Sequence, residues 1–178
     1  MKLQLKTRRL IPWIFVLLSA ASAINLVLGS RDYLLLYASL GQLQFTISKL
    51  NFQGAVPDET SILLQLQADN PVDYGGLRPT LVNISTYFVS DNSSLFDRIP
   101  VQRSWMINQT LAPHTLTTWT FDVTLNPQNA TSLSTFYNAH NGVVTAKTFS
   151  VFTVSSLLDI VTGSPSFYQL NQNVTLTK

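Results

Sequence analysis

Few side chains in this sequence are of the kinds that carry out catalysis or bind metals. The 178 residues include two histidines, nine acidic residues and no cysteine. Without cysteine there is no disulfide, no thiolate metal ligand and no cysteine nucleophile. His114 and His140 each stand apart from other ligands at the spacings of a zinc site, which needs three or four ligands. We therefore predict solvated loop histidines, no metal and no cofactor.

Acidic residues come close together in two places, at Asp58 with Glu59 and at Asp69 with Asp73. Two carboxylates across a cleft could hydrolyse a glycoside, and a loop rich in oxygen ligands could bind calcium weakly. Both pairs fall in segments that we expect to be loops, so solvated turns are the favoured interpretation. The sequence also contains no G-x-S-x-G, no G-x-x-x-x-G-K-[ST] and no G-x-G-x-x-G. We expect a protein that is not an enzyme.

Basic side chains are concentrated at the N-terminus. Lys2, Lys6, Arg8 and Arg9 all precede the first acidic residue, Asp32. Of the 11 bases seven remain, against nine acids, so the net charge of +2 is +4 from the tail and 7 − 9 = −2 from the rest. The chain beyond the tail has no basic stripe of the kind that binds phosphates, so we predict no nucleic-acid partner.

An uncharged apolar segment, residues 10–29, follows the basic tail. A helix of this length spans a hydrocarbon core of about 30 Å. Pro12 suits the first turn of such a helix, and Trp13 suits the membrane interface. Four bases before the segment and one after it predict a cytoplasmic N-terminus, with the chain after Ser30 outside, in the periplasm, the lumen or the extracellular space. Membrane lipid is therefore an expected partner.

Ala21-Ser22-Ala23 also matches the cleavage site of a secretory signal peptide. The apolar run continues past Ala23 to Leu28, which favours an uncleaved signal anchor in a single-pass membrane protein. The small side chains at this point would allow close packing against other transmembrane helices. The candidate packing residues are Ser19, Ala20, Ala21, Ser22 and Ala23.

The rest of the chain divides into a connector, residues 30–42, and an exported domain, residues 43–178. In the connector Tyr33, Leu36, Tyr37 and Leu40 share one helical face, so it either extends the anchor helix or lies at the membrane surface. From Leu43 the apolar period changes to two, which is typical of strands. We predict strands near 43–52, 62–68, 82–88, 99–107, 116–125, 143–154 and 168–176, a bulge at residues 48–49, and a short helix near 130–141. Short alternating strands at this spacing predict a mainly β fold, a seven-stranded antiparallel sandwich.

Two segments carry a resemblance to a known family. SILLQLQADNPVDYGGLRPTLVNISTYF, residues 61–88, has a strand that ends in Asn70-Pro71, a short loop with Tyr74 and a second strand. TLAPHTLTTWTFDVTL, residues 110–125, has a polar turn before a strand rich in β-branched residues. Both resemble the LEA2 domain (late embryogenesis abundant group 2, or water-stress and hypersensitive-response domain), over roughly residues 43–176. The resemblance implies a seven-stranded sandwich with one helix, often carried directly behind a membrane anchor, and it brings no catalytic residues.

Asn70-Pro71 also has a purely structural interpretation, which we favour. Asn before Pro forms turns, and Pro ends strand pairing. The pair would end the strand and expose the loop of Tyr74, Gly75 and Gly76.

Asn-x-Ser/Thr sequons occur five times, only mildly more often than chance. They would be glycosylated if the host modifies exported proteins, and a β-rich composition full of Asn and Thr is an equal explanation. The candidate sites are Asn83, Asn92, Asn108, Asn129 and Asn173.

Three functions remain open at this point. The first is an accessory subunit of a larger integral membrane complex, with the sandwich bracing its outer face. The second is a stand-alone stress-protective or lipid-handling domain, which could hold an acyl chain between its sheets, although Phe45, Leu64, Trp119 and Phe121 would fill a core equally well. The third is an enzyme of unrecognised mechanism, which the residue types disfavour.

Overall fold

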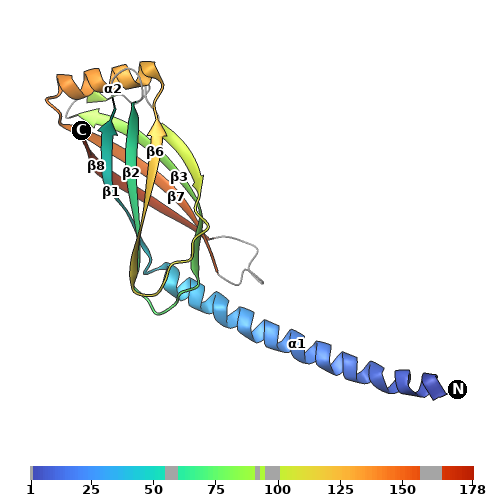
Figure 1. The fold of residues 1–178 in the computed structure, drawn as a ribbon. Helices are drawn as coiled ribbons and strands as arrows, with labels where there is room; N and C mark the ends of the chain where they lie inside the picture. Colours follow the sequence, from blue (N-terminus) through green and yellow to red (C-terminus); the bar gives the residue numbers. More distant parts are fainter. Residues whose placement is uncertain (1, 55–59, 91–92, 95–100, 157–165) are drawn as a thin grey trace.

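A computed structural model describes residues 2–54, 60–90, 93–94, 101–156 and 166–178. A long N-terminal helix, α1 (Lys2–Leu40), leads into a β domain whose far end carries a short helix, α2 (Pro127–Ala139) (Figure 1). The strands are β1 (Gln44–Gln53), β2 (Ser61–Asn70), β3 (Leu77–Ser90), β4 (Ser93–Ser94), β5 (Val101–Met106), β6 (Thr115–Thr124), β7 (Val144–Ser156) and β8 (Ser166–Thr177). The seven predicted strands and the short predicted helix are confirmed, and β4 adds a two-residue strand.

The strands form one continuous sheet in the order β4-β3-β7-β8-β1-β2-β6, with β5 paired to β3. The sheet folds over on itself into two layers, with β1, β2 and β6 facing β3, β5, β7 and β8 (Figure 1). Aromatic pairs join the layers. The rings of Phe45 and Phe152 stack with centroids 4.0 Å apart, and those of Trp105 and Phe121 stack at 4.4 Å. The predicted sandwich is therefore confirmed.

The sheet is mixed, so the prediction of a purely antiparallel sandwich was wrong at one strand pair. β1 and β8 run parallel, with Leu50 opposite Leu176 and Asn51 opposite Thr177. The reason is the direction in which the chain enters each strand. β1 leaves the end of α1, and β8 also starts at that end because β7 has just run toward it (Figure 1).

The predicted bulge in β1 is confirmed, because its register against β2 shifts between Ile47 and Lys49. The extra residue returns Leu50 and Phe52 to the interior face that Phe45 and Ile47 already occupy, and all four side chains are buried.

α1 is longer than the predicted anchor at both ends. It begins at Lys2, so Pro12 lies inside the helix and not in its first turn. Residues 2–9 are rich in Lys, Leu, Gln and Arg, which favour helix. The helix accommodates Pro12 at the cost of one hydrogen bond and of crowding between the proline ring and the carbonyl four residues earlier. At the other end the helix continues through the predicted boundary at Ser30 to Leu40. Of the two alternatives for the connector, the structure therefore has the extended helix.

α2 covers the end of the sandwich that lies away from α1 (Figure 1). The Asn126 side chain caps it by accepting a hydrogen bond from the Asn129 N–H at 2.8 Å, and Pro127 follows as its first residue. Ala130 and Leu133 are its buried residues, and they seal this end of the core.

Candidate functional site: the helix and its junction with the sandwich

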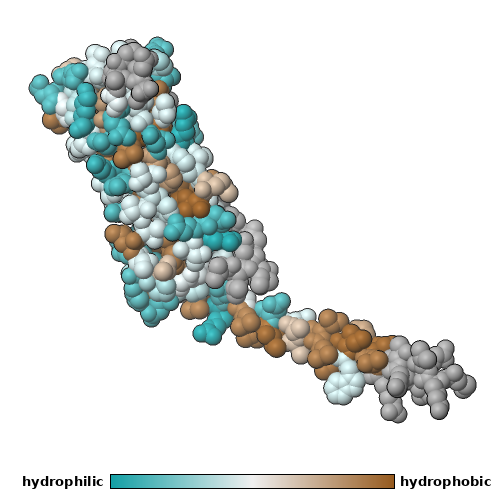
Figure 2. Space-filling model, viewed as in Figure 1, coloured by the Kyte–Doolittle hydropathy of each residue, from teal (hydrophilic) through white to brown (hydrophobic). Residues whose placement is uncertain are grey.

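The described surface of α1 is mostly apolar. Residues 10–28 are all exposed, including Trp13 at 68% and Leu17 at 67%. Figure 2 shows apolar side chains along the helix, whereas the visible face of the sandwich is mostly hydrophilic or intermediate. One helix, Leu10–Leu40, is long and apolar enough to cross a membrane within the described residues.

The residues predicted to set the topology and to pack helices all lie on α1. Lys2, Lys6, Arg8 and Arg9 belong to its first turns, and their side chains are outside the part of the chain that the structure describes. The small-residue patch, residues 19–23, lies midway along the helix and is exposed.

The C-terminal end of α1 is docked on the sandwich. Leu36 and Ser39 are buried, at 1% and 4% exposure, and Leu40 packs against the core. The helix ends in a tight turn in which the N–H groups of Gln42 and Leu43 both donate to the Ser39 carbonyl, at 3.0 and 3.1 Å. Directly after this turn the Leu43 side chain is buried in the core, at 1% exposure. Helix and sandwich therefore share one hydrophobic core.

A hydrogen bond also joins α1 to the loop between β2 and β3 at this junction. The hydroxyl of Tyr74, in the loop between β2 and β3, donates to Oδ1 of Asp32 on α1 at 2.5 Å. Burial raises the pKa of the Tyr74 phenol far above its ordinary value of about 10, and the Asp32 carboxylate raises it further by accepting its hydrogen bond and through its negative charge. The phenol therefore stays protonated and donates throughout the physiological range.

Asn70 organises the loop that carries Tyr74. Its buried side-chain amide donates to the Tyr74 carbonyl and to the Ala112 carbonyl, both at 3.0 Å. The second bond ties the β2–β3 loop to the segment before β6, which is the second segment that resembles the LEA2 domain. The motif thus has a structural role in joining two loops at the end of the sandwich next to α1.

The expectation that Asn70-Pro71 exposes its loop was wrong for all three loop residues named. Tyr74 and Gly75 are half-buried, and Gly76 is buried. A Cβ atom on Gly76 would lie 2.2 Å from both Cζ and Oη of Tyr74, so only glycine leaves room for this ring. The loop folds back on the helix because the Tyr74 hydroxyl finds its acceptor there.

The two histidines make different contacts in the structure. His114 Nε2 lies 2.7 Å from Oδ1 of Asp73, and both side chains are well exposed, so this contact is a solvated link between two loops. His140 pairs Nδ1 with the Phe136 carbonyl at 2.8 Å, at the end of α2. Asp69 lies in β2 and not in a loop as expected, because β2 extends to Asn70, while Asp58 and Glu59 lie outside the described residues. Nowhere in the described ranges do three His, Cys, Asp or Glu side chains group as metal ligands would.

The four predicted sequons within the described residues lie on the sandwich and on α2. Asn108 and Asn173 are exposed, Asn83 and Asn129 are half-buried, and Asn92 lies outside the described residues. Asn108 sits in the left-handed region, with φ of 50°.

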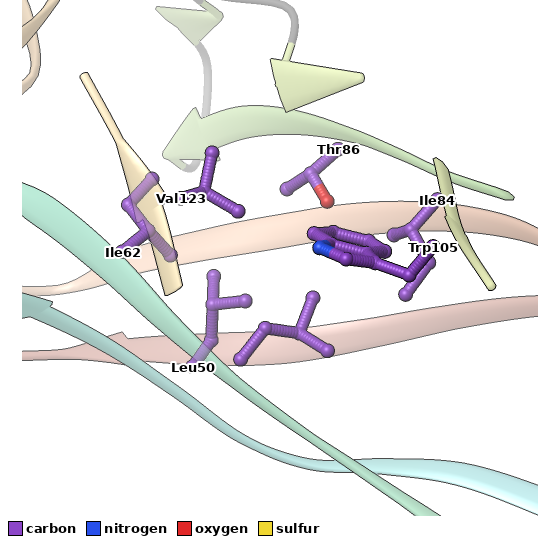
Figure 3. A pocket seen from close by; sticks show the side chains of 7 residues that line it. Leu50, Ile62, Ile84, Thr86, Trp105 and Val123 are labelled. Atoms are coloured by element: carbon purple, nitrogen blue, oxygen red, sulfur yellow. The ribbon is translucent and has the colours of Figure 1, made fainter. Parts of the chain in front are cut away.

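The interior between the two layers is filled by side chains. A cavity of about 10 Å³ lies between them, and Figure 3 shows the side chains that converge on it from both layers, including Leu50, Thr86 and Trp105. Pockets that hold small molecules measure roughly 300–1,000 Å³. This cavity therefore has no room for an acyl chain in the structure described.

Two residues that make contacts distant in sequence were not identified from the sequence. Asp32 was counted only as the first acid, although an acid just after an apolar helix is a signal that it has a partner. Gln172 on β8 carries no such signal. Its side chain accepts from the Ile47 N–H at 2.8 Å and donates to the Ile47 carbonyl at 2.9 Å, which links β8 to β1 beside the bulge.

Comparison with known proteins adds likenesses of fold. No family model and no curated protein matches the sequence. Similar solved structures include a protein from Archaeoglobus fulgidus. It is 10% identical, the match covers 76% of this chain and 94% of that chain, and the TM-score is 0.45. A protein from Arabidopsis thaliana has 10% identity, 75% and 80% coverage and a TM-score of 0.48. A third, described as a late embryogenesis abundant (LEA) protein, has 15% identity, 89% and 86% coverage and a TM-score of 0.40. These likenesses concern the fold alone and assign no activity, ligand or partner to this chain.

Proposed function

We propose that this protein is a non-enzymatic, single-pass membrane protein that serves as an accessory subunit of a larger integral membrane complex. In this proposal α1 is the anchor, and the sandwich braces the complex on the outer face of the membrane. The observation that carries the proposal is the junction between α1 and the sandwich.

The junction combines a buried contact with a directed bond. Leu36 and Leu43 belong to the core of the sandwich, and Tyr74 donates to Asp32 about one turn before Leu36. A domain joined to its anchor by a flexible linker can turn freely over the membrane. A domain that shares its core with the anchor keeps one orientation, which is what a brace in a complex requires.

The partners and the topology follow from the anchor. Exposed apolar side chains along residues 10–28 call for lipid or other transmembrane helices around them. The small residues 19–23 would be the site of close helix contact, as small side chains let two backbones approach. The bases at positions 2, 6, 8 and 9 would hold the N-terminus in the cytoplasm and leave the sandwich outside, in the periplasm, the lumen or the extracellular space.

The titratable residues near the junction support a structural role. Tyr74 and Asp32 are bonded to each other, and His114 is bonded to Asp73. Each pair joins two segments of the fold. The small interior cavity also favours a brace over a carrier of acyl chains between the sheets.

The test is purification of the full chain from its own membranes in mild detergent, with quantitative mass spectrometry of what accompanies it. We expect partner subunits in fixed stoichiometry. Replacing Ala20 and Ala23 by Leu should release those partners, whereas Val16→Leu, a similar change outside the small-residue patch, should not. A monodisperse monomer with bound lipid alone would contradict the complex and favour a stand-alone domain.

A further inference from the structure

The last three turns of α1 have two different faces. Residues at intervals of three or four form one face, which is turned to the sandwich. It comprises Gly29, Asp32, Leu36, Ser39 and Leu40, of which Gly29, Leu36 and Ser39 are buried and the other two half-buried. This periodicity is that of a helix packed on a neighbour along one side.

The remaining side chains from Tyr33 to Ala38 are exposed and mostly apolar, and they form the outer face of the helix. Leu34 is 68% exposed, Tyr37 51%, Tyr33 40% and Leu35 39%, and Ala38 is exposed beside them. A helix face turned to water normally carries charged and polar side chains. Among the described residues between Ser30 and Gly41, the exposed charge is Arg31. This outer face of residues 33–38 is separated from the exposed apolar surface of residues 10–28 by a single polar turn that carries the exposed Ser30 and Arg31.

We propose that the outer face of residues 33–38 is sunk in the lipid bilayer interface, so that the membrane boundary lies along Tyr33–Tyr37 and not at Gly29. The bound partner is lipid at the level where acyl chains meet headgroups. The sandwich then sits directly on the membrane, with the loop of Tyr74 at headgroup level. This inference rests on the proposed anchor and refines where the membrane ends.

The length of the helix fits this boundary. From Trp13 to Tyr33 there are 33 − 13 = 20 residues, which at 1.5 Å each span roughly 30 Å, the thickness of a hydrocarbon core. Aromatic side chains gather at both edges of a membrane. Trp13 would mark one edge, and Tyr33 with Tyr37, whose ring centroids lie 4.5 Å apart, would mark the other.

The charged side chains near Tyr33 are compatible with a position at the membrane interface. Arg31 is exposed and long enough to reach lipid phosphates while its stem stays among apolar groups. Asp32 lies on the docked face, where the Tyr74 hydroxyl donates to it. The acid is therefore turned to protein, and the exposed side chains that follow it are Tyr33, Leu34 and Leu35.

The experiment uses single cysteines, which are unambiguous because the chain has none of its own. The full chain, with Leu34→Cys or Tyr37→Cys, is labelled with a polarity-sensitive fluorophore and reconstituted in phosphatidylcholine vesicles that contain 5-doxyl or 12-doxyl lipid. Leu18→Cys in the middle of the span and Val143→Cys, 64% exposed near α2, are the matched controls.

We expect labels at 34 and 37 to be quenched by both lipids, at least twofold more by the shallow 5-doxyl lipid than by the 12-doxyl lipid. The label at 18 should be quenched more by the deep lipid, and the label at 143 by neither. If 34 and 37 behave like 143 while 18 is quenched, the boundary inferred here is wrong and the anchor stands. If 18 is not quenched either, the proposed anchor itself fails.

Discussion

The hydroxyl of Tyr74 donates to the carboxylate of Asp32 across 42 positions of sequence, and this bond closes the junction between α1 and the sandwich. Tyr74 belongs to the loop that follows Asn70-Pro71, so the most specific motif of the sequence lies at the anchor. The same loop is bonded through Asn70 to the segment before β6. The helix, the β2–β3 loop and the segment before β6 are therefore connected at one end of the domain.

Tyr74→Phe should lower the free energy of unfolding of the sandwich by about 1–2 kcal/mol, because a half-buried carboxylate loses its donor. Urea unfolding of the detergent-purified chain, followed by tryptophan fluorescence, measures the change. In a double-mutant cycle with Asp32→Ala, the second change should cost little once the first is made. Fully additive losses would mean that the two side chains act independently.

The stability of the protein should fall as the pH rises above about 10, and Tyr74 should cause part of the fall. The pKa of its phenol is raised in the folded protein, so between the ordinary pKa and the raised one the folded state holds a proton that the unfolded state has lost. Stability that is complete below pH 10 is therefore lost as the pH climbs toward the raised pKa. Unfolding free energies at pH 9, 10 and 11 should decline more steeply in the wild type than in Tyr74→Phe, whereas parallel curves would contradict the assignment.

Local patterns of apolar residues were sufficient to predict seven strands, the bulge and the two helices, but not the two-residue strand β4. In β1, for example, the slip from Ile47 to Leu50 marks the bulge because the side chains of a strand must alternate. The parallel contact of β1 with β8 could not be predicted in this way, since it depends on the end of the sandwich at which each strand starts.

Pairs distant in sequence were also beyond prediction. Tyr74 and Asp32 form a bond that no spacing encodes, and Gln172 is one amide among several on β8. The shared helical face predicted for residues 33–40 is split in the structure. Leu36 and Leu40 pack on the sandwich, while Tyr33 and Tyr37 stay exposed beside them. A helical period gives the face but not its partner, which depends on where the sandwich docks.

Gly76→Ala should disrupt the junction, whereas Gly41→Ala should not. A Cβ atom at position 76 would lie 2.2 Å from the Tyr74 ring, which must then swing away from Asp32, while a Cβ atom at position 41 meets nothing within 4 Å. We expect Gly76→Ala to cost at least as much stability as Tyr74→Phe, roughly 1–3 kcal/mol. In the Tyr74→Ala background the same glycine change should become nearly neutral. A comparable loss in both glycine variants would indicate a general effect of backbone freedom.

Asn70→Asp should be more damaging than its small change in shape suggests. The new carboxylate would place an oxygen against the carbonyls of Tyr74 and Ala112, which now accept from the Asn70 amide, and the site is buried. An uncompensated buried charge costs about 3–5 kcal/mol. Asn171→Asp, on the exposed face of β8, is the matched control and should change stability by less than about 0.5 kcal/mol. Equal unfolding midpoints for the two variants would refute the role given to Asn70.

Gln172→Leu should weaken the contact between β8 and β1. Its amide bonds both backbone groups of Ile47 at the point where β1 bulges, and ladder pairing between these two strands begins at Leu50. Without the amide, the N–H and carbonyl of Ile47 lose their partner, which costs about 1–3 kcal/mol. Hydrogen exchange should report this directly, as faster exchange of the Ile47 amide. Gln169→Leu removes an exposed amide from the same strand and should leave that rate unchanged. If the Ile47 amide exchanges equally slowly in both variants, the contact between β8 and β1 depends on the backbone pairing at Leu50 and not on Gln172.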